Sequence, residues 1–99
     1  MLRIKQTLKN GKAVFALEGR LDTVTSTELE EALKGSLDGI NDLTMDFENL
    51  DYISSAGLRL LLTAQKTMNK QGQMTLIHVR QSIQEILDVT GFSEILTIR

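Results

Sequence analysis

The stretch that decides the fold lies in the middle of the chain, where residues 51–59 read DYISSAGLR. Before it, apolar and polar residues alternate between positions 43 and 47, which indicates a half-buried strand. After it, apolar residues recur at helical spacing from Ser55 to Gln71, and Gly72 follows as a stop signal. The stretch is therefore predicted to join a strand to the first turn of a helix.

The start of this predicted helix favours an anion. The first turn of a helix offers unpaired backbone N–H groups and the positive end of the helix dipole, so a phosphate is stabilised there. Ser54 fits the N-cap position, which leaves the hydroxyl of Ser55 without a capping task. Gly57 inside the first turn costs about 1 kcal/mol relative to alanine. Either the close approach of a partner or tight internal packing would explain this glycine.

The same helix has two distinct faces at about 100° per residue. The polar face comprises Arg59, Thr63, Lys66 and Lys70. The face expected to contact the core comprises Gly57, Leu60, Leu61, Ala64 and Met68. Leu58 and Leu62 fall on neither face, so this pair either widens the core stripe or forms an exposed contact patch.

Two further segments precede the central strand. Asn10-Gly11 predicts a tight hairpin between a strand that contains Leu2 and Ile4 and a more central strand over residues 13–17. A helix is then expected to begin with a capping box from Thr25 to Glu28. Val24 and Leu29 occupy the hydrophobic-staple positions of that helix, and Gly39 is its expected stop.

The remaining segments complete an α/β pattern. Residues 74–79 are expected to form a strand, and residues 82–90 a short helix with a capping box from Ser82 to Glu85 and Gly91 at its end. A last strand is expected over 95–98. The order β-β-α-β-α-β-α-β predicts one α/β domain over residues 1–99, with a mixed four- to five-stranded sheet and helical crossovers.

Composition excludes several classes of function. The chain has 99 residues, no cysteine, one histidine and a net charge of −2. The charge argues against sequence-independent nucleic-acid binding, and the single histidine leaves few routes to a transition-metal site. No long apolar run opens the chain, so we expect neither a signal peptide nor a membrane span. The lack of cysteine favours a reducing, cytoplasmic location.

No catalytic constellation is visible. His78 lies within the strand expected over 74–79, with no acid–nucleophile set near it in the sequence, so we interpret it as a satisfied structural residue. Glu30, Glu31 and Lys34 are interpreted as a solvated helix face. The sequence contains no P-loop and no nucleophile elbow. We therefore expect no enzymatic activity, no cofactor and no metal.

The chain resembles the STAS domain family (sulfate transporter and anti-sigma factor antagonist), in particular the free-standing bacterial anti-sigma factor antagonists. The resemblance covers nearly the whole chain. The segments that carry it are GRLD at 19–22, MDF at 45–47, LDYI at 50–53, SSAGL at 54–58 and TGF at 90–92. The SSAGL block is the most specific of these.

The resemblance assigns roles to particular residues. The phosphorylated serine of the family falls on Ser55, and this chain has Ser54 where many members carry Asp, so Ser54 is an alternative site. Asp22 matches an acidic residue close to that serine, although it is also placed to cap a turn or the following helix. Leu58 matches a hydrophobic position that faces the partner kinase. The expected partner-binding residues are Asp22, Ser54, Ala56, Gly57, Leu58 and Leu62.

The function implied by the resemblance is partner switching. The unphosphorylated protein would bind an anti-sigma factor or related serine kinase of the GHKL ATPase type and thereby control a sigma factor. Phosphorylation of the serine would release the kinase, and a PP2C-type phosphatase would reverse the modification. The alternative is a constitutive STAS accessory subunit of a transporter or other complex, without phosphorylation.

Overall fold

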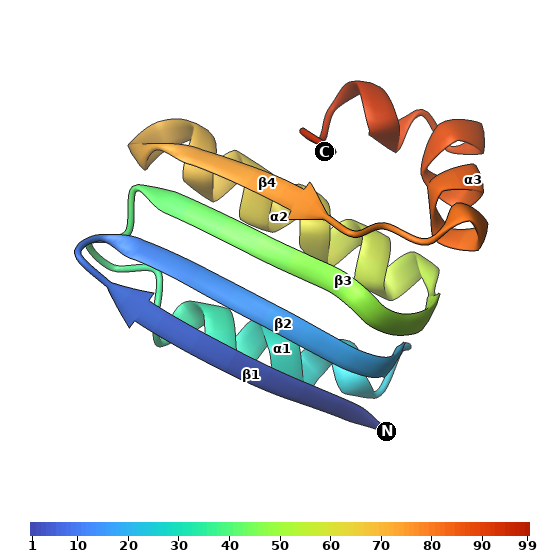
Figure 1. Ribbon diagram of the computed structural model, residues 1–99, viewed down its shortest axis with the longest axis horizontal. Coiled ribbons are helices and arrows are strands. Elements are labelled where there is room, and N and C mark those ends of the chain that lie inside the picture. Colours follow the sequence, from blue (N-terminus) through green and yellow to red (C-terminus); the bar gives the residue numbers. More distant parts are fainter.

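A computed structural model describes residues 1–99 (Figure 1). The elements are β1 (Leu2–Lys9), β2 (Lys12–Leu21), α1 (Thr25–Lys34), β3 (Asp42–Ile53), α2 (Ser55–Gln71), β4 (Gln73–Ile77), α3 (Gln81–Val89) and the 3-10 helix η1 (Phe92–Glu94). The strands form one sheet in the order β1-β2-β3-β4. β1 is antiparallel to β2, whereas β2, β3 and β4 are mutually parallel. The predicted α/β fold with a mixed sheet is confirmed.

The predicted hairpin is present. Lys9 pairs with Lys12, so Asn10 and Gly11 alone form the turn between β1 and β2. Both residues have positive φ, 51° and 77° respectively. Two-residue turns of this kind match the right-handed twist of the strands they connect, and Asn-Gly tolerates the left-handed backbone that they need.

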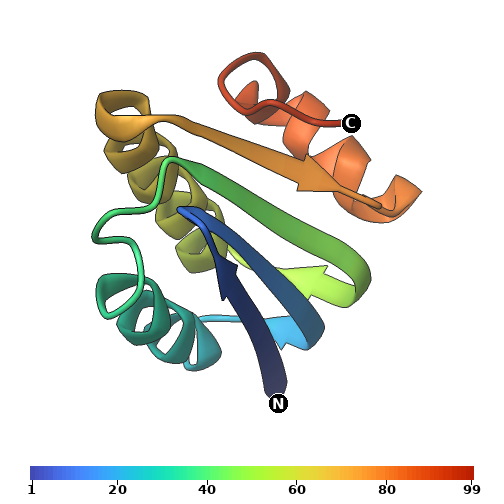
Figure 2. The ribbon, with the colours of Figure 1, turned by 60° about the vertical axis from the view of Figure 1, so that its left-hand side comes forward.

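The core lies between the sheet and two helices. Figure 2 shows α1 and α2 side by side on one face of the sheet. Side chains of β2 and, up to Phe47, of β3 alternate in burial, and the fully buried Phe15, Met45 and Phe47 point to this face. Beyond Phe47 the buried residues of β3 are Leu50 and Ile53, where the register with β2 shifts. Figure 1 shows α3 and the C-terminal segment beside β4. No helix has the length and apolar character required to cross a membrane.

The start of α1 differs from the prediction. The expected capping box from Thr25 to Glu28 is wrong, because Asp22 and Thr25 form a reciprocal pair three residues earlier. The Asp22 Oδ1 accepts from the backbone N–H of Thr25 at 2.9 Å, and the Thr25 Oγ1 accepts from the backbone N–H of Asp22 at 2.8 Å. Val24 is 76% exposed, so it forms no hydrophobic staple. The helix also ends at Lys34, before the expected stop at Gly39.

The C-terminal region also differs. The expected capping box at Ser82 is wrong, because α3 already begins at Gln81 and the residue before it makes no side-chain capping bond. The last expected strand, over 95–98, reduces to a single parallel bridge between Leu76 and Ile98. The residues before this segment form η1, and the N–H groups of residues 95 and 96 both donate to the Phe92 carbonyl.

The bounds of α2 agree with the prediction, and so do its core and polar faces. The five expected core residues are buried and the four expected polar residues are exposed. Of the two alternatives for Leu58, the exposed contact patch is wrong and the wider core stripe is confirmed, because Leu58 is only 7% exposed and packs in the core. Gln65, seven residues later, is buried as well, so the buried face of α2 is wider than the predicted stripe.

Candidate functional site

The carboxyl ends of β2 and β3 meet at one edge of the sheet. Leu21 and Ile53, the last residues of the two strands, are paired in register, and the Ser54 N–H donates to the Leu21 carbonyl at 2.9 Å. This pairing brings Asp22 and the two serines to adjoining strand ends. Ligands of open α/β sheets bind at this edge, because the helix N-termini that follow the strands point there.

Ser54 caps α2, as predicted. Its Oγ accepts from the Gly57 N–H at 3.3 Å, and its carbonyl accepts from the Leu58 N–H at 2.9 Å. The residue is half-buried and has the extended backbone that an N-cap requires. The hydroxyl of Ser54 is therefore committed to the helix start.

Ser55 is different. It is exposed at the first position of α2, and its hydroxyl forms no hydrogen bond within the protein. The N–H groups of Ser55 and Ala56 have no acceptor in the protein either, and the first turn of α2 contains no acidic residue. A solvent-facing hydroxyl thus stands beside unpaired N–H groups and the positive end of a helix dipole.

Asp22 is placed beside Ser54 but is engaged with α1. Its Oδ1 accepts from the backbone N–H groups of Val24 and Thr25 at 3.0 and 2.9 Å, and Arg20 Nε lies 4.0 Å from its Oδ2. The backbone hydrogen bond from Thr25 is the main reason why the pKa of Asp22 is lowered from its usual value. Asp22 makes no hydrogen bond to Ser55. The sequence left two roles open for Asp22, a contact near the serine and a cap at the start of α1. The hydrogen bonds of Asp22 are those of a cap.

Gly57 is explained by internal packing. A Cβ at this position would lie 2.9 Å from both Leu21 Cγ and Ile53 Cγ1, well inside contact distance. Any larger residue would push α2 away from the ends of β2 and β3. Of the two explanations left open by the sequence, the structure supports tight packing, and Gly57 itself is buried.

The other expected contact residues are distributed over different depths. Ala56 and Leu62 are half-buried, whereas Leu58 is buried in the core. A shallow hollow adjoins this region between the starts of α1 and α2. It is lined by Ser26, Glu30, Ala56, Arg59, Leu60 and Thr63.

Sequence reasoning missed three surface residues near the serines. Arg20 and Tyr52 are cross-strand partners, and the guanidinium of Arg20 lies 4.2 Å from the centre of the Tyr52 ring. Tyr52 is 38% exposed and Val24 is 76% exposed. The alternation in β3 gave no reliable signal for Tyr52, because it breaks after Phe47 and Leu50 is buried two positions before Tyr52. No sequence pattern predicted that Val24 is exposed, because its exposure depends on how the start of α1 is capped.

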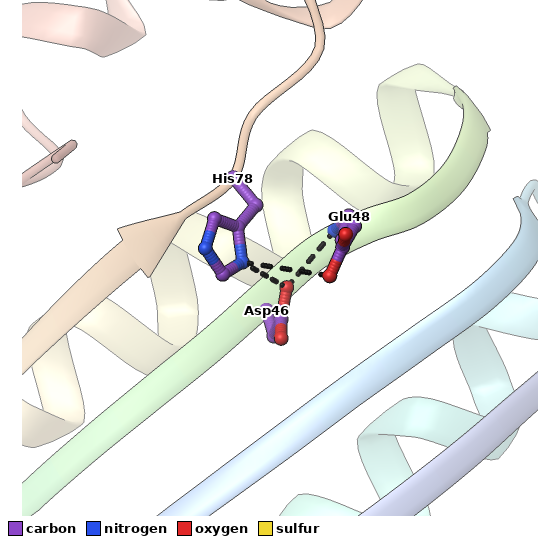
Figure 3. A group of neighbouring side chains, drawn as sticks. All are labelled: Asp46, Glu48 and His78. Atoms are coloured by element: carbon purple, nitrogen blue, oxygen red, sulfur yellow. Dashed lines mark hydrogen bonds and ion pairs between the residues drawn. The ribbon is translucent and has the colours of Figure 1, made fainter.

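His78 lies just beyond β4 and belongs to a separate cluster (Figure 3). Its Nδ1 is 2.9 Å from Asp46 Oδ1 and 3.9 Å from Glu48 Oε1. The hydrogen bond with Asp46 raises the pKa of His78 above its usual value. The interpretation of His78 as a residue with a satisfied hydrogen bond is confirmed.

Comparison with known proteins identifies the family. The STAS domain model matches residues 3–99. BtrV of Bordetella bronchiseptica, provisionally named an anti-sigma factor antagonist, is 31% identical over 91 residues, covering 90% of this chain and 78% of BtrV. An anti-sigma factor antagonist from Mycobacterium paratuberculosis has a similar structure (TM-score 0.89, 19% identity, 99% of this chain and 85% of that one). The phosphorylated form of SpoIIAA, a Bacillus cell fate determinant, is similar as well (TM-score 0.76, 15% identity, 100% and 91%). The chain therefore belongs to the STAS domain family.

Proposed function

We propose that this protein is a phosphorylatable partner-switching regulator. Unphosphorylated, it binds an anti-sigma factor or related serine kinase of the GHKL ATPase type in the cytoplasm, which controls sigma-factor activity. The kinase phosphorylates Ser55, the complex dissociates, and a PP2C-type phosphatase restores the binding form. The protein is itself no enzyme in this scheme. The observation that carries the proposal is the exposed Ser55 hydroxyl, free of hydrogen bonds at the start of α2.

The difference between the two serines favours Ser55 over Ser54. Ser54 Oγ already accepts from the Gly57 N–H, and Ser54 is half-buried, so a kinase would have to open the helix start to reach it. Ser55 needs no such rearrangement. SpoIIAA, a structural neighbour, has been solved in a phosphorylated form, so the fold is compatible with the modification.

Local electrostatics allow the phosphate to act on the partner rather than on the fold. A phosphoserine adds about −1.5 to −2 charges at pH 7. The N–H groups and dipole of α2 stabilise this charge, and Arg59 lies one turn further along the helix. A partner carboxylate about 5 Å away would be repelled by roughly 3 kcal/mol at an effective dielectric constant of about 20. That energy corresponds to about a hundredfold loss of affinity.

The surface around Ser55 supplies contacts for the partner. Ala56 and Leu62 on α2 are accessible in part, and Val24 and Tyr52 add exposed apolar area on the neighbouring elements. Leu58 is buried in the isolated domain and therefore contributes to the packing of α2 rather than to this surface. Asp22 contributes by fixing the loop between β2 and α1 next to Ser54.

Phosphorylation with matched serine variants tests the proposal. The protein is incubated with ATP and its cognate serine kinase, and intact-mass and fragment spectrometry locate the product. We expect one phosphate on Ser55, its loss in Ser55→Ala, and its retention in Ser54→Ala. Phosphate found on Ser54 would assign the phosphorylation site to Ser54 instead. Stable binding without any phosphate would favour the constitutive accessory subunit instead.

A further inference from the structure

A cluster of one histidine and two carboxylates lies on the face of the sheet that α1 and α2 leave uncovered (Figure 3). Asp46 and Glu48 alternate with the buried Met45 and Phe47 along β3, so both carboxylates point to this open face. His78 reaches them from the end of β4, 30 residues after Glu48 in the chain. None of the three belongs to the surface around Ser55.

The backbone holds these side chains together. Asp46 pairs with Ile77 in the parallel register of β3 and β4, which places His78 one step further along the same edge. His78 has a φ of 57°, and this left-handed turn ends the strand at the point where the imidazole meets the carboxylates. The convergence is therefore set by the sheet and not by flexible loops alone.

The distances between the donor atoms suit a metal ion. His78 Nδ1 is 2.9 Å from Asp46 Oδ1 and 3.9 Å from Glu48 Oε1, and all three donor atoms lie within 4.8 Å of one another. Nitrogen and oxygen ligands bind zinc at about 2.0–2.2 Å, which places tetrahedral donors about 3.4 Å apart. Small side-chain rotations at the exposed Glu48 and His78 would bring the three atoms to these separations.

No lysine or arginine balances the charges of the two carboxylates in the cluster. The carboxylates of Asp46 and Glu48 have no lysine or arginine within 4.0 Å, and His78 is their only ion-pair partner. Arg80 is occupied elsewhere, because its guanidinium binds the Asp51 carboxylate at 2.9 Å and the Glu48 carbonyl at 3.2 Å. By contrast, Glu18, Asp22 and Asp51 each pair with an arginine. Two carboxylates beside one imidazole thus form a site that a cation would neutralise.

We propose that Asp46, Glu48 and His78 form a surface binding site for a divalent transition-metal ion such as Zn²⁺, with water in the remaining coordination position. Imidazole nitrogen and carboxylate oxygen are suitable zinc donors, and three protein ligands leave one position open. His78 Nδ1 presents its lone pair to the metal while the ring proton resides on Nε2, so the metal replaces the hydrogen bond to Asp46. The two carboxylates supply what a single histidine lacks, which is why composition alone indicated no metal site.

Calorimetric titration of Zn²⁺ into the metal-free, untagged protein tests the site, with Co²⁺ absorption as a second readout. We expect saturable binding of one ion per chain. Glu48→Gln and His78→Asn should each weaken it at least tenfold. Asparagine is chosen because it tolerates the left-handed backbone at position 78. Asp42→Asn is the matched control, since it removes a carboxylate from the same strand that forms no ion pair and lies outside the cluster, and it should leave the affinity unchanged.

The thermal midpoint provides an independent check. Zn²⁺ should raise the Tm of the native protein, because a metal that bridges β3 and the segment after β4 binds only the folded state. It should not raise the Tm of His78→Asn. Absence of saturable binding at millimolar Zn²⁺, or an unchanged affinity in His78→Asn, would overturn the proposal. Phosphorylation of Ser55 is measured separately, so neither result bears on the partner-switching proposal.

Discussion

The starts of α1 and α2 lie at adjoining strand ends, yet they are built differently. At α1 the negative charge is supplied by a side chain of the protein, because the Asp22 carboxylate accepts from the backbone N–H groups of Val24 and Thr25. The backbone N–H of Asp22 in turn donates to the Thr25 hydroxyl. At α2 the cap is a neutral serine with one bond of 3.3 Å, and Ser55 beside it is free. Helix starts favour negative charge. The charge is permanent at α1, whereas α2 leaves room for a charge that modification can add and remove.

The largest effect expected in this region comes from Leu58→Ala. Because Leu58 is buried in the core, the change should lower the free energy of unfolding by about 2–5 kcal/mol. Urea denaturation measures this loss. Leu62→Ala is the matched control, since Leu62 is half-buried and lies one turn further along α2, and its loss should be smaller. A nearly unchanged stability together with weakened kinase binding would return Leu58 to the contact surface.

Gly57→Ala should be the next most damaging change. The new methyl group would meet Leu21 and Ile53 at 2.9 Å, and overpacking of this kind costs about 1–3 kcal/mol. Gly35→Ala at the end of α1 is the control, because its Cβ would have only one neighbour, at 3.8 Å, and its φ of −81° suits alanine. Thermal unfolding of the pair should show a loss for Gly57→Ala alone. Equal midpoints would show that α2 can shift away from the sheet without cost.

The two serines should respond in opposite ways to alanine. Ser54→Ala removes the cap of α2 and should cost about 1 kcal/mol of stability. Ser55→Ala should leave stability nearly unchanged, because the Ser55 hydroxyl has no partner in the protein. Denaturation measures the stability of the two variants, and a phosphorylation assay on the same proteins shows which serine receives the phosphate. A larger loss of stability in Ser55→Ala than in Ser54→Ala would indicate that Ser55 is the cap and Ser54 the phosphorylation site.

Two substitutions of Asp22 should distinguish its capping role from a role of its charge. Asp22→Asn keeps an oxygen that can accept from Thr25, whereas Asp22→Ala removes it. If Asp22 acts only as a cap, Asp22→Asn keeps most of the native Tm and the native rate of Ser55 phosphorylation, and Asp22→Ala loses stability. A slower phosphorylation of folded Asp22→Asn would instead assign Asp22 to the kinase contact.

The smallest expected effect is the pH dependence at α1. Hydrogen bonds, first of all from the Thr25 N–H, lower the pKa of Asp22 below its usual 3.8. The carboxylate therefore contributes its stability above the unfolded-state pKa, and that contribution is lost as the pH falls through the lower folded-state pKa. An NMR titration of the Asp22 carboxyl group should show this low pKa. Thr25→Val, which removes the side-chain bond, should raise it, and an unchanged pKa would leave the backbone bonds as its sole cause.

Local signals predicted much of the fold and half of the candidate site. The Asn10-Gly11 turn, the bounds of α2 and the Ser54 cap are present as expected. Each of these features is decided by residues a few positions apart, through turn geometry, helical periodicity or a hydrogen bond across one helical turn. Such signals remain visible in the sequence whatever the rest of the chain does.

The sequence by itself determined the α/β order, the strand-to-helix turn that presents Ser55, and the family resemblance. Tertiary structure decided that the Asp22 carboxylate, rather than the Thr25 hydroxyl, caps the start of α1, because β2 extends to Leu21 through its pairing with β3. It also decided that Leu58 is buried and that His78 meets Asp46. These outcomes depend on strand register and on how closely α2 packs on the sheet, which are contacts between residues far apart in the chain that no local pattern encodes.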